Sequence, residues 1–169
     1  MKLLLVQHGE AAESAVDPLR PLSPEGVRDV RALAAACRRF ALHPGSIVHS
    51  GKLRAEQTAE ILGKALGLPV SASAGYDPLD PVKPVARQCE GWTDDRLIVG
   101  HMPFLGRLAA LLLAGREEPD VVAFQRGGMA CLEKRNPREW CLLWTCFPRQ
   151  PVTITPGRAK PAGRKPRGG

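Results

Sequence analysis

Short apolar segments alternate with helical segments four times in the first 115 residues, and this alternation restricts the fold more than any other feature. The spacing predicts strands over 2–7, 46–50, 68–72 and 96–100, and helices over 24–41, 52–66, 82–90 and 103–115. Strands that are apolar on both faces and lie between helices form a parallel sheet covered on both sides. We therefore predict an α/β fold, a three-layer α/β/α sandwich with a mostly parallel central sheet.

The last third of the chain follows a different pattern. The stretches "VVAF" (121–124), "GMACLEK" (128–134) and "EWCLLWTC" (139–146) predict three further strands, the last two joined by a turn at 136–138. Beyond them, "TPGRAKPAGRKPRGG" has five basic residues and no acidic one. Such a segment has little apolar surface to bury, so we expect one domain over 1–152 and a disordered basic tail over 153–169.

Charge and composition exclude several classes of function. The net charge of the chain is +7, and the tail contributes five of these positive charges. The domain itself is therefore only weakly basic, and a nucleic-acid partner is not expected. No apolar run approaches the roughly 18–20 residues that span a bilayer. The five cysteines form no C-x-x-C pair, so we expect free thiols in a cytoplasmic protein and no association with membranes.

Polar residues end three of the predicted parallel strands. Gln7-His8-Gly9 follows the first strand, His49-Ser50 the second and His101 the fourth, whereas His43 falls between a helix and a turn and is expected at the surface. The carboxyl ends of parallel strands share one edge, where such sheets bind ligands. Three histidines near Arg54 suit a phosphate better than a metal, although a three-histidine zinc site remains an alternative.

Three motifs carry a resemblance to a known family. The segments "LVQHGE", "LRAEQTAEIL" and "VGHMP" resemble the signatures of the histidine phosphatase superfamily, and "RPLSPEG" at 20–26 is most similar to its SixA-type phosphohistidine phosphatase branch. The resemblance covers about residues 1–150 and implies a phosphoglycerate mutase-like fold. It implies a phosphatase in which His8 is the nucleophile, Arg54 binds the phosphoryl oxygens and His101 steadies them in the transition state.

Five further residues are expected to contact the substrate: Gln7, Gly9, Arg20, His49 and Lys52. The family normally has arginine where this chain has Gln7, which donates hydrogen bonds but carries no charge. A charge-assisted bond is worth about 1.5–3 kcal/mol, roughly double a neutral one. We expect Lys52 or Arg20 to supply the missing charge; a slow enzyme, or a site that binds phosphate without turnover, are the other outcomes.

The remaining expectations concern the proton donor and the substrate. Glu10 either orients His8 or is a solvated acid, and Asp77 is a possible general acid. Without a clear acid, the readily protonated imidazole of phosphohistidine is a better leaving group than an alcohol. We expect a monomer that needs no metal or cofactor and acts on a histidine-phosphorylated phosphotransfer protein. The alternatives are a small-molecule phosphomonoesterase and a non-catalytic phosphoprotein-binding module.

Overall fold

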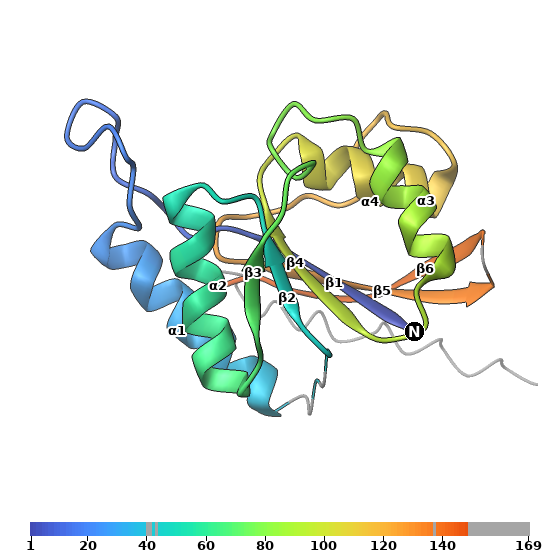
Figure 1. Cartoon of the computed structure of the whole chain (residues 1–169), viewed down its shortest axis with the longest axis horizontal. Coiled ribbons are helices and arrows are strands. Elements are labelled where there is room, and N and C mark those ends of the chain that lie inside the picture. The colour runs from blue at the N-terminus through green and yellow to red at the C-terminus, as the bar shows by residue number, and fades with distance from the viewer. Residues whose placement is uncertain (40–41, 43, 137, 149–169) are drawn as a thin grey trace, which may run out of the picture.

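One six-stranded sheet forms the centre of the computed structural model, which describes residues 1–39, 42, 44–136 and 138–148 (Figure 1). Its order is β3-β2-β4-β1-β5-β6. The strands are β1 (Lys2–Gln7), β2 (Ile47–His49), β3 (Val70–Ala72), β4 (Arg96–Gly100), β5 (Met129–Asn136) and β6 (Glu139–Cys146). The first four run parallel, and β5 and β6 are antiparallel additions at one side.

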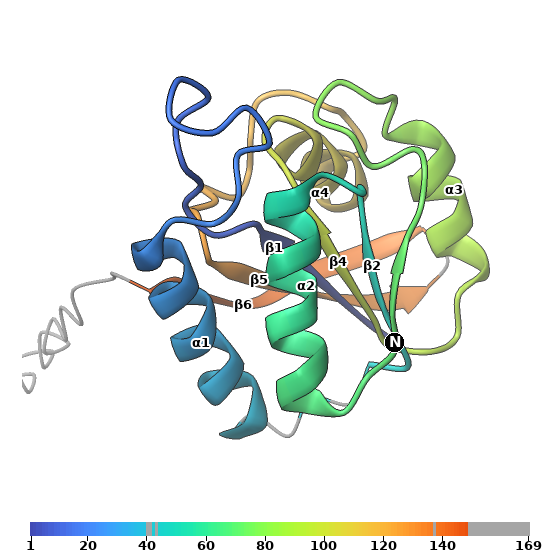
Figure 2. The ribbon, with the colours of Figure 1, turned by 60° about the vertical axis from the view of Figure 1, so that its left-hand side comes forward.

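In the described ranges four helices are present, and they cover the two faces of the sheet (Figures 1 and 2). They are α1 (Pro24–Arg39), α2 (Leu53–Leu66), α3 (Lys83–Gly91) and α4 (Phe104–Ala114). Side chains of β1 alternate between the faces: Leu4 and Val6 pack with α1 and α2, and Leu3 and Leu5 pack with α3 and α4. The predicted three-layer α/β/α sandwich is confirmed.

The register of the parallel strands brings the site residues to one edge. Gln7 at the end of β1 lies opposite Gly100 of β4, and His49 at the end of β2 lies opposite Val99. The chain therefore leaves β1, β2 and β4 at the same edge of the sheet, which we call the catalytic edge. The loops 8–23 and 73–82 also stand at this edge (Figure 1).

One predicted strand is wrong. The stretch 121–124 forms bends and an irregular segment instead of a strand. Its apolar residues are still used, because Val122 is buried in the core cluster of α3 and α4 and Phe124 packs against it. An apolar run can therefore cover a core without joining the hydrogen-bond ladder, and periodicity alone does not separate the two cases.

The other predicted elements are confirmed: β1, β4 and β6 have the predicted bounds, β5 extends to Asn136, and the ends of the rest differ by one to two residues. Strands β2 and β3 have three residues each, and α1 ends at Arg39, while residues 40, 41 and 43 lie outside the described ones. The predicted tail, 153–169, lies outside them as well. No helix in the described part of the chain is long and apolar enough to cross a bilayer.

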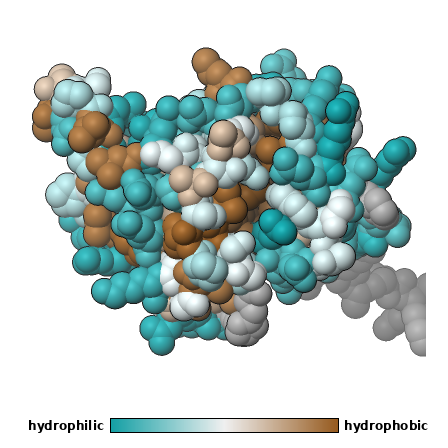
Figure 3. Space-filling view, viewed as in Figure 1, coloured by the Kyte–Doolittle hydropathy of each residue, from teal (hydrophilic) through white to brown (hydrophobic). Residues whose placement is uncertain are grey.

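The surface is mostly hydrophilic in the view of Figure 3, with apolar groups standing out in places. One such group lies at the upper left, where the loop that follows β1 protrudes in the same view of the ribbon. Five cysteine thiols are free, of which Cys37, Cys89 and Cys131 are buried.

Candidate active site

The ring of His8, directly after β1, is held by two hydrogen bonds of opposite direction. Its Nδ1 lies 2.6 Å from the carbonyl oxygen of Gly9, and the Nε–H of Arg54 donates to its Nε2 at 3.2 Å. A carbonyl oxygen only accepts, so Nδ1 carries the proton, and Nε2 presents a lone pair. The geometry thus selects the tautomer in which Nε2 is a nucleophile.

His101 lies beside this ring at the end of β4. The ring centroids of His8 and His101 are 4.9 Å apart, with the planes tilted by 59°. The Nε2 of His101 is 2.6 Å from the hydroxyl of Ser50, which follows β2. Its Nδ1 is buried and has no hydrogen-bond partner among the described residues. Residues from the ends of three strands therefore meet at one point, as the parallel-sheet rule predicts.

The surroundings keep both imidazoles neutral. Burial, which has the largest effect, and the positive charges of Arg54, Arg126 and Arg20 together lower the pKa of His8 to about 4, against the hydrogen bond to Gly9, which raises it. Burial also lowers the pKa of His101 to about 3, with the other histidine and nearby cations acting in the same direction. At neutral pH the nucleophile therefore needs no base to remove a proton from it.

Arg54 comes from the first turn of α2, close to the catalytic edge. Burial and the charge of Arg20 lower the pKa of its guanidinium, and Asp77 opposes them. The residue before the helix, Lys52, makes no side-chain cap hydrogen bond to the first turn of α2. A cation and a helix N-terminus at one place form an arrangement suited to a phosphoryl group.

Two residues of the α2 segment position this site, and the sequence analysis assigned them no role. The hydroxyl of buried Thr58 accepts the N–H of Gly9 at 3.1 Å and donates to the carbonyl of Arg54 at 2.7 Å. Gln57 accepts the N–H of Leu22 at 2.7 Å. Both stand in "LRAEQT", so the motif itself held the signal: its polar residues connect α2 to the loop after β1.

Gly9 is required for packing. It is not among the glycines with positive φ, so a left-handed turn does not explain it. A Cβ atom there would lie 2.8 Å from a methyl group of Val30 and 3.0 Å from one of Leu22. The segment after His8 therefore lies against α1 too closely for any side chain. Gln7, the residue before His8, has a buried side-chain oxygen, Oε1, that accepts no hydrogen bond from the described part of the chain.

Arg20 contributes charge from the loop after β1. Its Nε–H donates to the carbonyl of Ala12 at 3.3 Å, and its backbone has φ of 52°, in the left-handed region. Its charge acts on both His8 and Arg54, lowering the pKa of each. The structure therefore brings this predicted rim cation to the site.

Lys52 and His49 occupy different positions. The Nζ of Lys52 lies 3.2 Å from Oδ1 of Asp77, and its charge also lowers the pKa of His101. The buried ring of His49 accepts the N–H of Gly51 through Nδ1 at 3.1 Å, so it organises the turn after β2. Lys52 thus reaches the site with its charge already paired, and Asp77, the possible general acid, is its partner.

Glu10 interacts away from the nucleophile. Its carboxylate accepts the hydroxyl of Ser23 at 3.4 Å and lies 3.8 Å from Nη1 of Arg126. The position beside Nδ1 of His8, where an orienting acid would stand, is taken by the carbonyl of Gly9. The structure therefore places Glu10 as a partner of cationic and hydroxyl groups.

Arg126 is a site residue that the sequence analysis missed. The next residue, Gly127, donates its N–H to the carbonyls of Gln7 at 3.0 Å and His8 at 3.1 Å, and the N–H of Gln7 donates to Gly128 at 3.1 Å. These bonds hold the segment before β5 against the end of β1, and the Arg126 charge lowers the pKa of His8. "QRGG" gives no local signal for this contact, because it depends on strand pairing.

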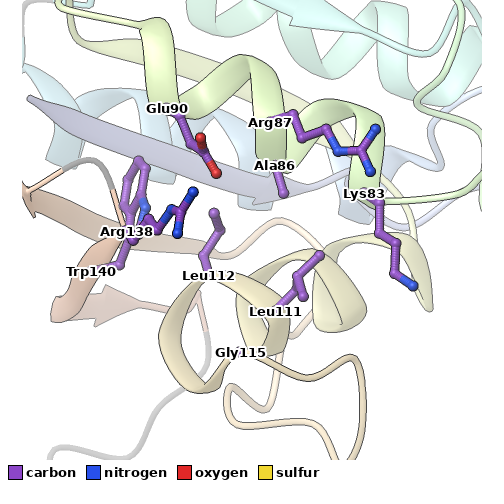
Figure 4. A pocket seen from close by; sticks show the side chains of 9 residues that line it. All are labelled: Lys83, Ala86, Arg87, Glu90, Leu111, Leu112, Gly115, Arg138 and Trp140. Carbon is purple, nitrogen blue, oxygen red and sulfur yellow. The ribbon is translucent and has the colours of Figure 1, made fainter.

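Other features of the molecule lie apart from this site. No cluster of three or more His, Cys, Asp or Glu side chains in the described ranges is arranged to hold a metal ion. A groove of about 320 Å³ lies between α3, α4 and the start of β6 (Figure 4). It is lined by Lys83, Ala86, Arg87, Glu90, Leu111, Leu112, Gly115, Arg138 and Trp140. It shares no residue with the His8 site, so we assign it no part in the chemistry.

Comparison with known proteins agrees with this geometry. Residues 3–77 match the model of the histidine phosphatase superfamily (branch 1). Phosphohistidine phosphatase SixA of Escherichia coli (strain K12) is 32% identical over 126 residues, which are 70% of this chain and 78% of that protein. An uncharacterized protein of Picosynechococcus sp. is 35% identical over 124 residues, 69% of this chain and 75% of that protein.

A solved structure shows the same fold. The protein histidine phosphatase SixA complexed with tungstate superposes with a TM-score of 0.77 at 28% identity, covering 88% of this chain and 97% of that one. Together the fold, the paired histidines and these relatives define a hydrolase with a histidine nucleophile. The chain belongs to the histidine phosphatase superfamily and is of the SixA type.

The charge state of the two histidines can be measured directly. We expect the imidazole ¹⁵N resonances of His8 and His101 to stay constant from about pH 8 to about pH 5, because their lowered pKa values delay protonation to about pH 4 and about pH 3. In this range His8 should show a protonated Nδ1 and a bare Nε2. Titration of His8 near its ordinary pKa of about 6.5, or the opposite tautomer, would contradict the geometry.

Proposed function

We propose that this enzyme removes the phosphoryl group from phosphohistidine on a signalling phosphotransfer protein. The observation that carries the proposal is the fixed tautomer of His8, whose Nε2 lone pair faces Arg54 beside His101. In the first step Nε2 forms a bond to phosphorus while the bond from phosphorus to the substrate imidazole breaks. The leaving nitrogen takes a proton from solvent.

Water completes the cycle. Its oxygen forms a bond to phosphorus, the bond between phosphorus and Nε2 breaks, and the electron pair returns to the ring of His8. Inorganic phosphate leaves, and a water proton passes to solvent. Arg54 and the neutral His101 stabilise the phosphoryl oxygens in both steps, because preorganised donors in a buried site act on charge as it develops.

Two observations support an oxyanion of this kind as the substrate group. The related SixA structure contains tungstate, a tetrahedral oxyanion. In this chain the charges of Arg20, Arg54 and Arg126 all act on His8, so a bound anion would be surrounded by cations.

The free cysteine thiols fit a reducing compartment, and we propose that the enzyme acts in the cytoplasm.

The leaving group favours phosphohistidine over an ester. Asp77 stands in an ion pair with Lys52, and Glu10 lies near Arg126, so neither acid is held ready to protonate an alkoxide. An imidazole leaving group needs less help, because it accepts a proton near neutral pH. The chemistry of the site thus suits cleavage of a phosphorus–nitrogen bond.

We expect a phosphorylated histidine phosphotransfer domain to be hydrolysed with a kcat/KM at least tenfold above that of any phosphate ester in a panel. His8→Ala should reduce both activities by at least about 1000-fold, because the nucleophile is lost. The assay is release of inorganic phosphate by wild type and variant in parallel. Esters that are preferred tenfold would replace the proposal with a small-molecule phosphomonoesterase, and full activity of His8→Ala would refute the mechanism.

We further propose that Arg126 supplies the charge that Gln7 lacks. Arg126 acts on His8, and its own ion pair with Glu10 is long, at 3.8 Å, whereas Lys52 is paired with Asp77 at 3.2 Å. The positive charge of Arg126 is therefore less neutralised by its carboxylate partner than the charge of Lys52 is.

A double-mutant cycle tests this compensation. Arg126→Gln should lower turnover by about 10–100-fold, the effect of losing one charge-assisted bond in the transition state. In a Gln7→Arg background the same change should cost much less, and Gln7→Arg alone should raise turnover by less than about tenfold. A rise beyond about 100-fold for Gln7→Arg would show that nothing compensates.

The matched control for the cycle is Arg135→Gln. Arg135 has an exposed fraction of 57%, against 58% for Arg126, and it also lies 3.8 Å from a glutamate, Glu133. Its ion-pair partner is Glu133 on the same strand, and it acts on neither His8 nor Arg54 among the described residues, so its replacement should leave turnover unchanged. Equal losses of turnover for Arg126→Gln and Arg135→Gln would show that the loss follows from the change in overall charge, and would contradict a specific role of Arg126.

A further inference from the structure

The most exposed large apolar side chains gather on two loops. Among the described residues, Val16, Leu19 and Leu79 have exposed fractions of 79%, 71% and 82%, whereas the next exposed ones, Val121, Leu142 and Leu143, have only 40–41%. Val16 and Leu19 belong to the loop that follows β1, and Leu79 to the loop between β3 and α3. Both loops stand at the catalytic edge (Figure 1).

The same two loops supply charges to the active site. Arg20, next to Leu19, lowers the pKa of His8 and Arg54. Asp77, two residues before Leu79, raises the pKa of Arg54. Each loop therefore has an inner charged residue that acts on the site and an outer apolar residue in water. In Figure 3 apolar atoms protrude over the upper-left loop.

Internal hydrogen bonds give these loops a fixed shape. The N–H of Leu19 donates to Oδ1 of Asp17 at 2.9 Å, and the N–H of Val16 donates to the carbonyl of Glu13 at 3.0 Å. In the other loop the N–H of Asp77 donates to Oδ2 of Asp80 at 2.8 Å. The apolar side chains are thus presented to water by ordered backbone, so covering them requires little further ordering.

We propose that Val16, Leu19 and Leu79 form an apolar rim that docks the protein carrying the phosphohistidine. This inference rests on the proposed function and adds the surface by which the protein substrate is recognised. Both loops stand at the catalytic edge, where a phosphohistidine ring must approach Nε2 of His8, so the surface around that ring extends toward the two loops. Single exposed apolar residues are common, but the three most exposed large apolar side chains of the described residues all lie on the two loops of the catalytic edge, which favours a contact surface there.

The chemistry of the partner follows from this arrangement. The partner's phosphoryl group binds near the arginines around His8, which form the floor of the site. Apolar side chains of the partner that flank its phosphohistidine cover the apolar rim. A free phosphorylated amino acid contacts the floor alone, because it has no surface that extends to the loop tips. The rim therefore contributes to binding of a protein substrate and not to the chemical step.

The test compares two variants on two substrates. The rim variant combines Val16→Ser, Leu19→Ser and Leu79→Ser; the matched control combines Leu142→Ser and Leu143→Ser on β6, which remove exposed apolar side chains elsewhere. The substrates are a phosphorylated histidine phosphotransfer domain and free phosphohistidine. Thermal unfolding midpoints of all proteins are recorded alongside.

We expect the rim variant to lose at least tenfold in kcat/KM on the phosphorylated domain, mainly through a higher KM, and to keep its activity on free phosphohistidine within twofold. The control should match wild type on both substrates. Unchanged kcat/KM on the domain, or equal losses on both substrates, would overturn the docking surface while leaving the proposed function intact. No hydrolysis of either substrate by wild type would overturn the proposed function itself, and the docking surface with it.

Discussion

The hydrogen bond from Nδ1 of His8 to the carbonyl of Gly9 is the interaction on which the rest of the site depends. At 2.6 Å it fixes the proton on one ring nitrogen and leaves the lone pair on the other. Burial then keeps the ring neutral, and three arginine charges act in the same direction by lowering its pKa. A nucleophile toward an anion is thus kept both unprotonated and surrounded by cations, and the cations that bind the phosphoryl group also help to hold the pKa down.

Contacts from α2 and α1 hold the backbone of Gly9, which accepts the hydrogen bond from Nδ1 of His8. Thr58 of α2 binds the N–H of Gly9, so the carbonyl that receives Nδ1 belongs to a peptide segment held from both sides. On the other side α1 packs so closely that a Cβ atom on Gly26 would lie 2.1 Å from the carbonyl oxygen of Glu10. The segment "RPLSPEG" therefore matters as a packing surface for the turn after the nucleophile.

Local pattern and a fold rule were sufficient for much of this structure. Continuous apolar strands predicted the sheet, and their common carboxyl edge predicted that His8, His101 and Arg54 would meet. The sequence could not show which group binds Nδ1, because that group is a backbone carbonyl, which every residue has. Arg126 was missed for a related reason: its position depends on the pairing of β5 with β1 and has no local pattern. The run at 121–124 was misread because a buried loop and a strand share the same apolar composition.

The most direct test of this account is to identify the phosphorylated atom. Rapid-quench reaction of ¹⁵N-histidine-labelled enzyme with excess phosphorylated domain, stopped in alkali, should give a phosphoenzyme whose phosphorus couples to Nε2 of His8. Alkali preserves a phosphoramidate that acid would cleave. Phosphorus bonded to Nδ1 of His8, or to His101, would contradict the central claim that the backbone of Gly9 selects the nucleophilic nitrogen.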